Sequence, residues 1–95
     1  MNPALPGAHC VYLLLGKNRH LYIGCTADLE RRFNEHKTGK VFSTKRYLPV
    51  KLIYWEVYSS KVDAFNREKA LKQYGSAFTK LKLRLRDTLQ GGRAG

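Results

Sequence analysis

Acidic residues are scarce in this sequence, and it has no long apolar run. Only 7 Asp and Glu stand against 18 Lys and Arg, which gives a formal net charge of +11 at pH 7. Such a surplus attracts polyanions, and nucleic acid is the commonest polyanion that a small protein meets. No apolar stretch approaches the roughly 20 residues of a membrane-spanning helix, and residues 1–9 lack the basic-then-apolar layout of a signal peptide. We therefore expect a cytoplasmic protein that binds nucleic acid and no membrane.

Cysteine and histidine are also few, which excludes two common kinds of small domain. Cys10 and Cys25 are the only cysteines, too few for a disulfide framework, and we expect free thiols in a reducing compartment. The three histidines, at positions 9, 20 and 36, do not have the spacing of a structural zinc site. The fold must therefore depend on an ordinary apolar core.

The length and composition support one domain. The chain has 95 residues, of which 43% are hydrophobic and 12% aromatic, so it is too apolar for a disordered basic tail. A chain of this size buries one modest core. We expect a single domain over residues 8–89, with flexible termini at 1–7 and 90–95.

Apolar and β-branched runs predict three strands. Residues 9–15 and 21–24 are apolar segments joined by a polar turn, which is typical of a β-hairpin. Residues 49–58 give the strongest strand signal in the chain. Because this third segment is apolar on both faces, we expect it at the centre of the sheet.

Three helices are predicted as well. The first begins at an N-cap, Thr26 or Asp28, and stops before Gly39. The second opens on a capping box at Ser60, and the last covers residues 76–89 with its leucines inward. The order ββαβαα predicts an α+β fold, with a small three-stranded antiparallel or mixed sheet flanked by helices.

Two tyrosine tripeptides and one helix carry the most specific pattern. Cys10-Val11-Tyr12 lies on the first strand and Tyr22-Ile23-Gly24 on the second, and Asp28-Leu29-Glu30-Arg31-Arg32 opens the helix. On these residues the chain resembles a GIY-YIG nuclease domain, in particular the small stand-alone bacterial members. The resemblance covers about residues 8–89. It departs at the first tripeptide, where Cys and Val replace the Gly and Ile of the family name and the phenol is kept.

The resemblance implies a metal-dependent endonuclease and points to two of its residues. Arg32, ten residues after Tyr22, matches the family's catalytic arginine. Glu68 matches the glutamate that holds one divalent ion, Mg²⁺ or Mn²⁺. Glu56 on the third strand is the competing carboxylate, and the motif match favours Glu68.

The chemistry of phosphodiester hydrolysis favours the same kinds of side chain. The guanidinium of Arg32 can bond two phosphate oxygens and stabilise charge at a five-coordinate phosphorus. Glu68 can hold one ion that polarises the phosphate. Tyr12 or Tyr22 can orient or deprotonate the attacking water, and His36, with an ordinary pKa of about 6.5, is an alternative base or phosphate donor. The sequence leaves the choice among these three open.

Cations around these residues are candidate phosphate contacts. The loop 40–46 and the residues that flank Glu68 are expected to border the site. The nucleic-acid-binding candidates are Lys17, Arg31, Lys37, Lys40, Lys45, Arg46, Arg67, Lys69 and Lys72. Arg19 and the outward cations of the last helix, Lys80, Lys82, Arg84 and Arg86, are further candidates.

Together these observations predict an endonuclease that hydrolyses DNA in repair or recombination. The chain shows no zinc-finger or helix-turn-helix pattern, so we expect structure-selective or weakly sequence-specific cutting, with specificity open to a protein partner. The alternative is a non-catalytic, basic nucleic-acid-binding module, including an RNA-associated one. A cleavage assay with and without metal separates the two.

Overall fold

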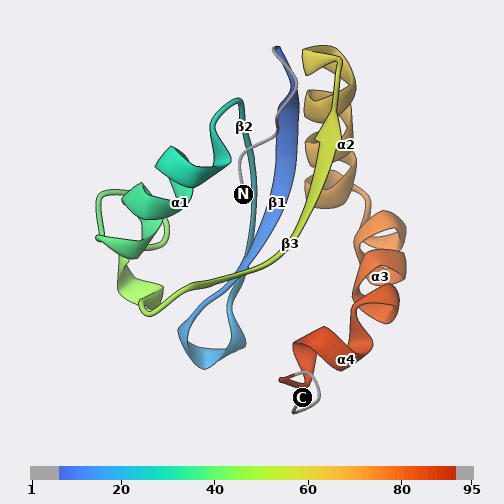
Figure 1. Ribbon diagram of the computed structural model, residues 1–95. Coiled ribbons are helices and arrows are strands. Elements are labelled where there is room, and N and C mark those ends of the chain that lie inside the picture. Colours follow the sequence, from blue (N-terminus) through green and yellow to red (C-terminus); the bar gives the residue numbers. More distant parts are fainter. Residues whose placement is uncertain (1–6, 92–95) are drawn as a thin grey trace.

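The computed structural model of this protein describes residues 7–91, and it has an α+β fold as expected. The elements in chain order are β1 (His9–Leu15), η1 (Lys17–Arg19), β2 (Leu21–Thr26), α1 (Leu29–Lys37), η2 (Lys45–Tyr47), β3 (Lys51–Tyr58), α2 (Lys61–Gln73), α3 (Gly75–Arg84) and α4 (Arg86–Leu89). The three strands form one antiparallel sheet in the order β2-β1-β3. Figure 1 shows α1 on one side of this sheet and α2 and α3 on the other. Of the termini that were expected to be flexible, 1–7 and 90–95, residues 1–6 and 92–95 lie outside the described residues.

The central strand is β1, so the expectation that segment 49–58 would be central is wrong. β1 pairs with β2 on one side and β3 on the other, and its residues from Cys10 to Leu14 are buried. β3 is an edge strand, and Trp55 and Val57 on it are 43% and 46% exposed. Apolar side chains on both faces of β3 therefore do not require a central position in the sheet. One face of β3 packs against α2, and the apolar side chains on its other face are only partly buried.

Residues of β1 alternate between two cores, one on each face of the sheet. Val11 and Leu13 belong to the core beneath α2 and α3, together with Ala64, Leu71 and Leu81. The opposite face holds Cys10, Tyr12, Leu14, Leu29 and Val50. This period of two is what a strand buried on both faces requires. It places the phenol of the first tripeptide on the side of α1.

Helix ends follow the predicted caps, and the last helix is interrupted. The Asp28 side chain accepts from the Arg31 amide at the start of α1, and Ser60 does the same for the Asp63 amide at the start of α2. Gly39 follows the end of α1 with a φ of +76°, a left-handed conformation that favours glycine. The predicted single helix 76–89 is divided into α3 and α4 at Leu85, whose ψ of 20° departs from helical geometry.

The two cysteines are free thiols that face opposite sides of the sheet. Cys10 lies opposite Thr26 in the register of β1 and β2, and Cys25 lies opposite Val11. Since adjacent residues on a strand point to opposite faces, the two sulfurs cannot be bridged in this register. Among residues 7–91, no helix has the length and apolar character needed to cross a membrane.

Candidate active site

The phenol of Tyr12 is placed by the glycine opposite it. Tyr12 pairs with Gly24 across the first two strands and is buried. A Cβ atom on Gly24 would lie 2.3 Å from Cζ and 2.4 Å from Oη of Tyr12, closer than real contacts allow. The tyrosine ring therefore lies directly over the glycine. The two tripeptides form one packing unit, and the glycine of the second fixes the phenol of the first.

His36 is the hydrogen-bond partner of the Tyr12 hydroxyl. It lies near the end of α1 and is fully buried, with 0% of its surface exposed. Its Nε2 is 2.8 Å from the Tyr12 hydroxyl, and its Nδ1 is 2.7 Å from the Thr44 hydroxyl. Thr44 is equally buried and also donates to the carbonyl oxygen of Val41 at 3.5 Å. A hydrogen-bonded series Tyr12–His36–Thr44 therefore runs inward from the sheet to the loop before η2.

This series is uncharged at neutral pH. Burial and the neighbouring charge of Arg32 together lower the pKa of His36 to about 4, against a smaller rise caused by Glu35. Burial, together with the nearby Tyr22, raises the pKa of Tyr12 above its ordinary value, and Arg32 opposes that rise. Because the Thr44 proton is donated to a backbone carbonyl, we infer that Thr44 accepts from Nδ1–H and that Nε2 accepts from the Tyr12 hydroxyl.

Arg32 faces this series, and its neighbour Arg31 faces solvent. The Arg32 guanidinium donates to Glu35 at 3.1 Å, and its side chain is 35% exposed. Arg31 is 61% exposed and pairs with Asp28 and Glu35. Burial alone lowers the pKa of Arg32, but the bond to Glu35 and the phenols of Tyr12 and Tyr22 raise it, so the guanidinium stays charged. The half-buried arginine is the one that the motif predicts.

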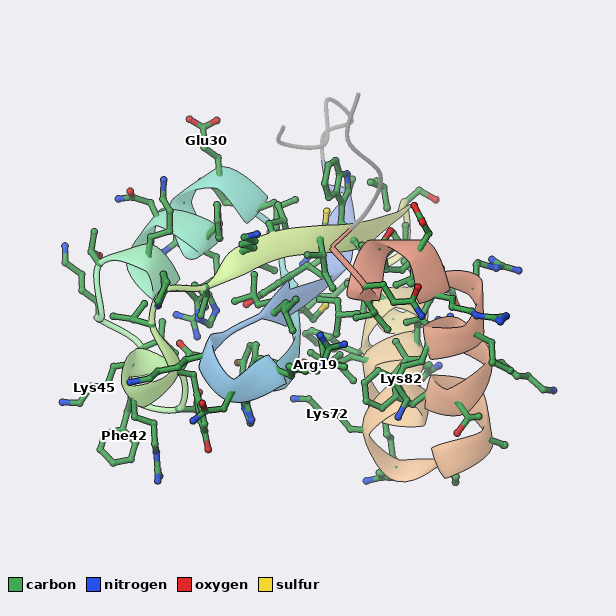
Figure 2. All side chains as sticks on the ribbon, turned by 90° about the horizontal axis from the view of Figure 1, so that it is seen from below. Arg19, Glu30, Phe42, Lys45, Lys72 and Lys82 are labelled. Atoms are coloured by element: carbon green, nitrogen blue, oxygen red, sulfur yellow. The ribbon has the colours of Figure 1, made fainter. Side chains whose placement is uncertain are left out.

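Tyr22 and Glu68 complete the cluster from β2 and α2. The Tyr22 ring centroid lies 5.0 Å from that of His36 and 6.3 Å from that of Tyr12. Lys72 lies 5.9 Å above the Tyr22 ring and 3.2 Å from the Glu68 carboxylate. Figure 2 shows Lys72 extending from α2 toward the side of the molecule on which Phe42 and Lys45 lie. All five predicted catalytic residues are thus brought together, from four different elements.

Glu56, the competing carboxylate, is engaged elsewhere. It accepts two bonds from Arg67, both at 3.0 Å, and one each from Tyr54 and Tyr58 at 2.5 and 2.6 Å. Burial raises the pKa of Glu56, but these donors lower it by more, so the carboxylate is ionised. Arg67 is therefore committed to a structural pair on the far side of α2. Of the two carboxylates that the sequence offered, Glu68 is the one near Tyr12 and Tyr22.

The residues fit an ion held by a single protein ligand. In the part of the chain that the structure describes, no three His, Cys, Asp or Glu side chains group as ligands of one ion. Glu68 is partly exposed and already balances a cation, Lys72. A divalent ion bound by one carboxylate, waters and a substrate phosphate is the usual arrangement for Mg²⁺.

Most of the predicted phosphate contacts are exposed. Lys37 lies 5.1 Å above the Phe33 ring, and Lys45 lies 5.8 Å from the Phe42 ring on the loop that carries Thr44. The exposed candidates are Lys17, Arg31, Lys37, Lys40, Lys45, Arg46, Lys69 and Lys72. Thr44 is the member of the cluster that the sequence did not single out, because a lone threonine in a polar loop carries no recognisable signal.

Comparison with known proteins agrees with this arrangement. Residues 8–82 match the family model of the GIY-YIG catalytic domain. The chain is 44% identical over 64 residues to a UPF0213 protein of Streptococcus agalactiae, with 66% of this chain and 73% of that protein covered. It is 41% identical over 76 residues to a UPF0213 protein of Staphylococcus haemolyticus, with 79% and 92% covered. A solution NMR structure of a UPF0213 protein from Bacillus halodurans aligns with a TM-score of 0.51 and 29% identity over 80% of this chain and 84% of the other.

Proposed function

The chain belongs to the GIY-YIG family of catalytic domains, and from this premise we propose that it is a metal-dependent endonuclease acting on DNA. The observation that carries the proposal is the neutral series Tyr12–His36–Thr44 with the charged Arg32 beside it. A buried tyrosine hydroxyl needs a hydrogen-bond partner whatever its role, but a neutral imidazole nitrogen as that partner can also take the proton of the phenol when the phenol accepts one from water. The series therefore supplies a route for that proton.

Tyr12 is then a proton relay to His36. In the attacking step a water oxygen forms a bond to phosphorus while its proton passes to Tyr12 Oη, and the Tyr12 proton passes to His36 Nε2. The P–O bond to the leaving oxygen breaks, and that oxygen takes a proton from solvent. The relay avoids the free phenolate, which the raised pKa of Tyr12 disfavours, and it protonates His36 only while the phosphate gains negative charge, because the lowered pKa of His36 disfavours an isolated imidazolium. Tyr22, whose ring lies against both partners, positions the water.

Arg32 and Glu68 stabilise the charge that develops on the phosphate. A half-buried guanidinium near the phenol is worth more to a developing anion than one in water, because the low dielectric strengthens the interaction. Glu68 would hold a Mg²⁺ or Mn²⁺ ion, which when bound supplies Lewis-acid polarisation of the phosphate. Lys72 releases Glu68 for this role by turning to the substrate phosphate instead.

DNA is the proposed substrate because of the charge and the type of site. The net charge of +11 and the exposed cations around the cluster support binding through the backbone, which carries no sequence information. We propose cutting that depends on DNA structure or has low sequence specificity, in repair or recombination, with a protein partner as the source of any further selectivity. The free thiols suit a reducing compartment such as the cytoplasm.

The test is a cleavage assay on plain, nicked, flapped and branched DNA with Mg²⁺, Mn²⁺ or a chelator. We expect metal-dependent cutting that Glu68→Gln abolishes and that Glu30→Gln leaves intact. Glu30 is the matched control because it is exposed on α1 and points away from the cluster in Figure 2. Equal cutting by the Glu68→Gln protein would indicate a contaminating nuclease and overturn the proposal.

The alternative is a nucleic-acid-binding module without catalysis. The pairing of Glu68 with Lys72 favours it, because a carboxylate satisfied by a lysine need not recruit an ion. On this alternative, binding of DNA or RNA is independent of metal and no substrate is cut. The same assay panel, extended to RNA, therefore decides between the two.

A further inference from the structure

A cationic cavity lies between α2 and α3, apart from the cluster of Tyr12, Tyr22, Arg32, His36 and Glu68, which we call the tyrosine cluster. Its volume is about 380 Å³, and it is lined by Arg67, Ser76, Ala77, Lys80, Leu81 and Arg84. Ser76, Lys80 and Arg84 follow one another at intervals of four residues, so they share one face of α3. Arg67 meets this face from α2. Three cations and one hydroxyl thus surround the same space.

Arg67 is held rigidly at the wall of this cavity. Its Nε and Nη2 donate to the two carboxylate oxygens of Glu56, each at 3.0 Å. The N–H groups of Nη1 therefore remain to donate to a ligand. Glu56 in turn accepts the hydroxyls of Tyr54 and Tyr58. The guanidinium therefore loses little freedom when it binds an anion.

The charge of the cavity fits a phosphate. Glu56 pairs with Arg67 at the wall, and the residues that line the cavity include three cations and no carboxylate. The residues that line the cavity include no aromatic ring on which a base could stack. A backbone phosphate of nucleic acid, held without contact to its base, matches this lining.

The cavity and the tyrosine cluster flank α2. Arg67 and Glu68 are successive residues on this helix, so their side chains point about 100° apart. Arg67 turns to Glu56 on β3, and Glu68 turns to Lys72, which covers Tyr22 on β2. Since β2 and β3 are the two edges of the sheet, the two sites lie on different sides of one helix.

We propose that the α2–α3 cavity binds a second backbone phosphate of the nucleic acid whose scissile phosphate lies at the tyrosine cluster. The identity of this ligand as nucleic acid rests on the proposed function, and the presence of a phosphate site does not. A nucleic acid bound at both sites places its sugar–phosphate backbone on two sides of α2. A nucleic acid that bends or branches at this helix can put one phosphate in the cavity and another at the tyrosine cluster.

The phosphate site is tested with inorganic phosphate. Titration of the ¹⁵N-labelled protein should shift the amide signals of Ser76 and Lys80 and the Nε signal of Arg67 in a saturable way. The Ser76→Glu variant, which adds a negative charge at the wall, should abolish these shifts. Absence of saturable shifts in the unaltered protein overturns the proposal.

The nucleic-acid ligand is tested with duplex and branched DNA in the presence of a chelator, so that no cleavage is required. The double variant Lys80→Gln/Arg84→Gln should reduce the slope of log affinity against log salt by roughly two contacts, or about 1.8 on duplex DNA. The control is Lys51→Gln/Lys61→Gln, which removes the same charge from exposed positions outside the cavity lining. The proposal is overturned if the salt slope falls equally in both double variants, or if it does not fall in Lys80→Gln/Arg84→Gln. This holds even if the protein proves to be a nuclease. A protein that binds through the cavity yet never cuts would overturn only the proposed function.

Discussion

Acidification should destabilise this protein through His36 in particular. The imidazole is fully buried between Tyr12 and Thr44, and its pKa is lowered from 6.5 to about 4. In the unfolded chain the same group titrates near 6.5. Between these two values the unfolded state binds one more proton than the folded state. Stability therefore rises with pH across this window, is fully present above pH 6.5 and is lost as pH falls toward 4.

The size of this loss follows from the two pKa values. Within the window the slope is about 1.4 kcal/mol per pH unit, so the loss at pH 5 is roughly 2 kcal/mol and the total below pH 4 is roughly 3 kcal/mol. A domain of this size has a free energy of unfolding of about 5–14 kcal/mol. One histidine thus controls a substantial part of the acid stability.

The measurement is urea unfolding at half-unit steps from pH 8 to pH 5, for the unaltered protein and for His36→Gln. The two proteins share all other titrating groups, so the contributions of these groups cancel in the difference between the two curves of unfolding free energy against pH. We expect this difference to change by roughly 2 kcal/mol over the range. The ring signals of His36 in NMR provide a second measurement, which does not depend on the variant folding. A constant difference, or a midpoint near 6.5 for His36 in the folded protein, would refute the reasoning.

Three further predictions concern the cluster and its borders. Arg32→Ala should lower single-turnover cleavage by on the order of a hundredfold or more, whereas Arg31→Ala should only weaken binding and reduce the salt slope by up to about one unit; an equal loss of rate in both would contradict the placement of α1. Gly24→Ala brings a methyl carbon within 2.3 Å of the phenol ring above it and should cost about 1–3 kcal/mol in urea unfolding, while Gly75→Ala, with open space around it, should not show this loss. Phe42 is 81% exposed beside Lys45 and should stack on an unpaired base. Phe42→Ala should therefore weaken the binding of flapped DNA by about 1–3 kcal/mol and leave the binding of plain duplex unchanged. An equal loss of affinity for both substrates would argue against stacking.

Local signals in the sequence predicted the hairpin and the helix caps, and the family resemblance pointed to every member of the cluster except Thr44. Asp28, Ser60 and Gly39 act through neighbouring backbone groups, so their positions can be read within a few residues. The approach of Tyr12 to His36 follows from the same local pattern. A strand of period two and a helix of period 3.6 place both side chains on the side where β1 meets α1.

Features set by contacts distant in sequence could not be predicted. The edge position of β3 depends on which strand β1 pairs with on its second side, and the hydrophobic pattern of one strand does not contain that information. The engagement of Arg67 by Glu56 joins residues eleven positions apart on different elements. Thr44 acquires its role only because the loop after α1 folds back over His36.

The strand register that separates Cys10 from Cys25 also determines how this protein responds to oxidants. Burial raises the pKa of both thiols, that of Cys25 to about 11, where Glu68 adds to the effect. Only the thiolate reacts with alkylating agents or disulfides. At pH 7 a thiol of that pKa is ionised in about one molecule in ten thousand. We therefore expect the folded protein to withstand air and glutathione disulfide without a reductant, and the buried Cys10 to take up thiol-reactive labels at a rate that reports how often the sheet opens.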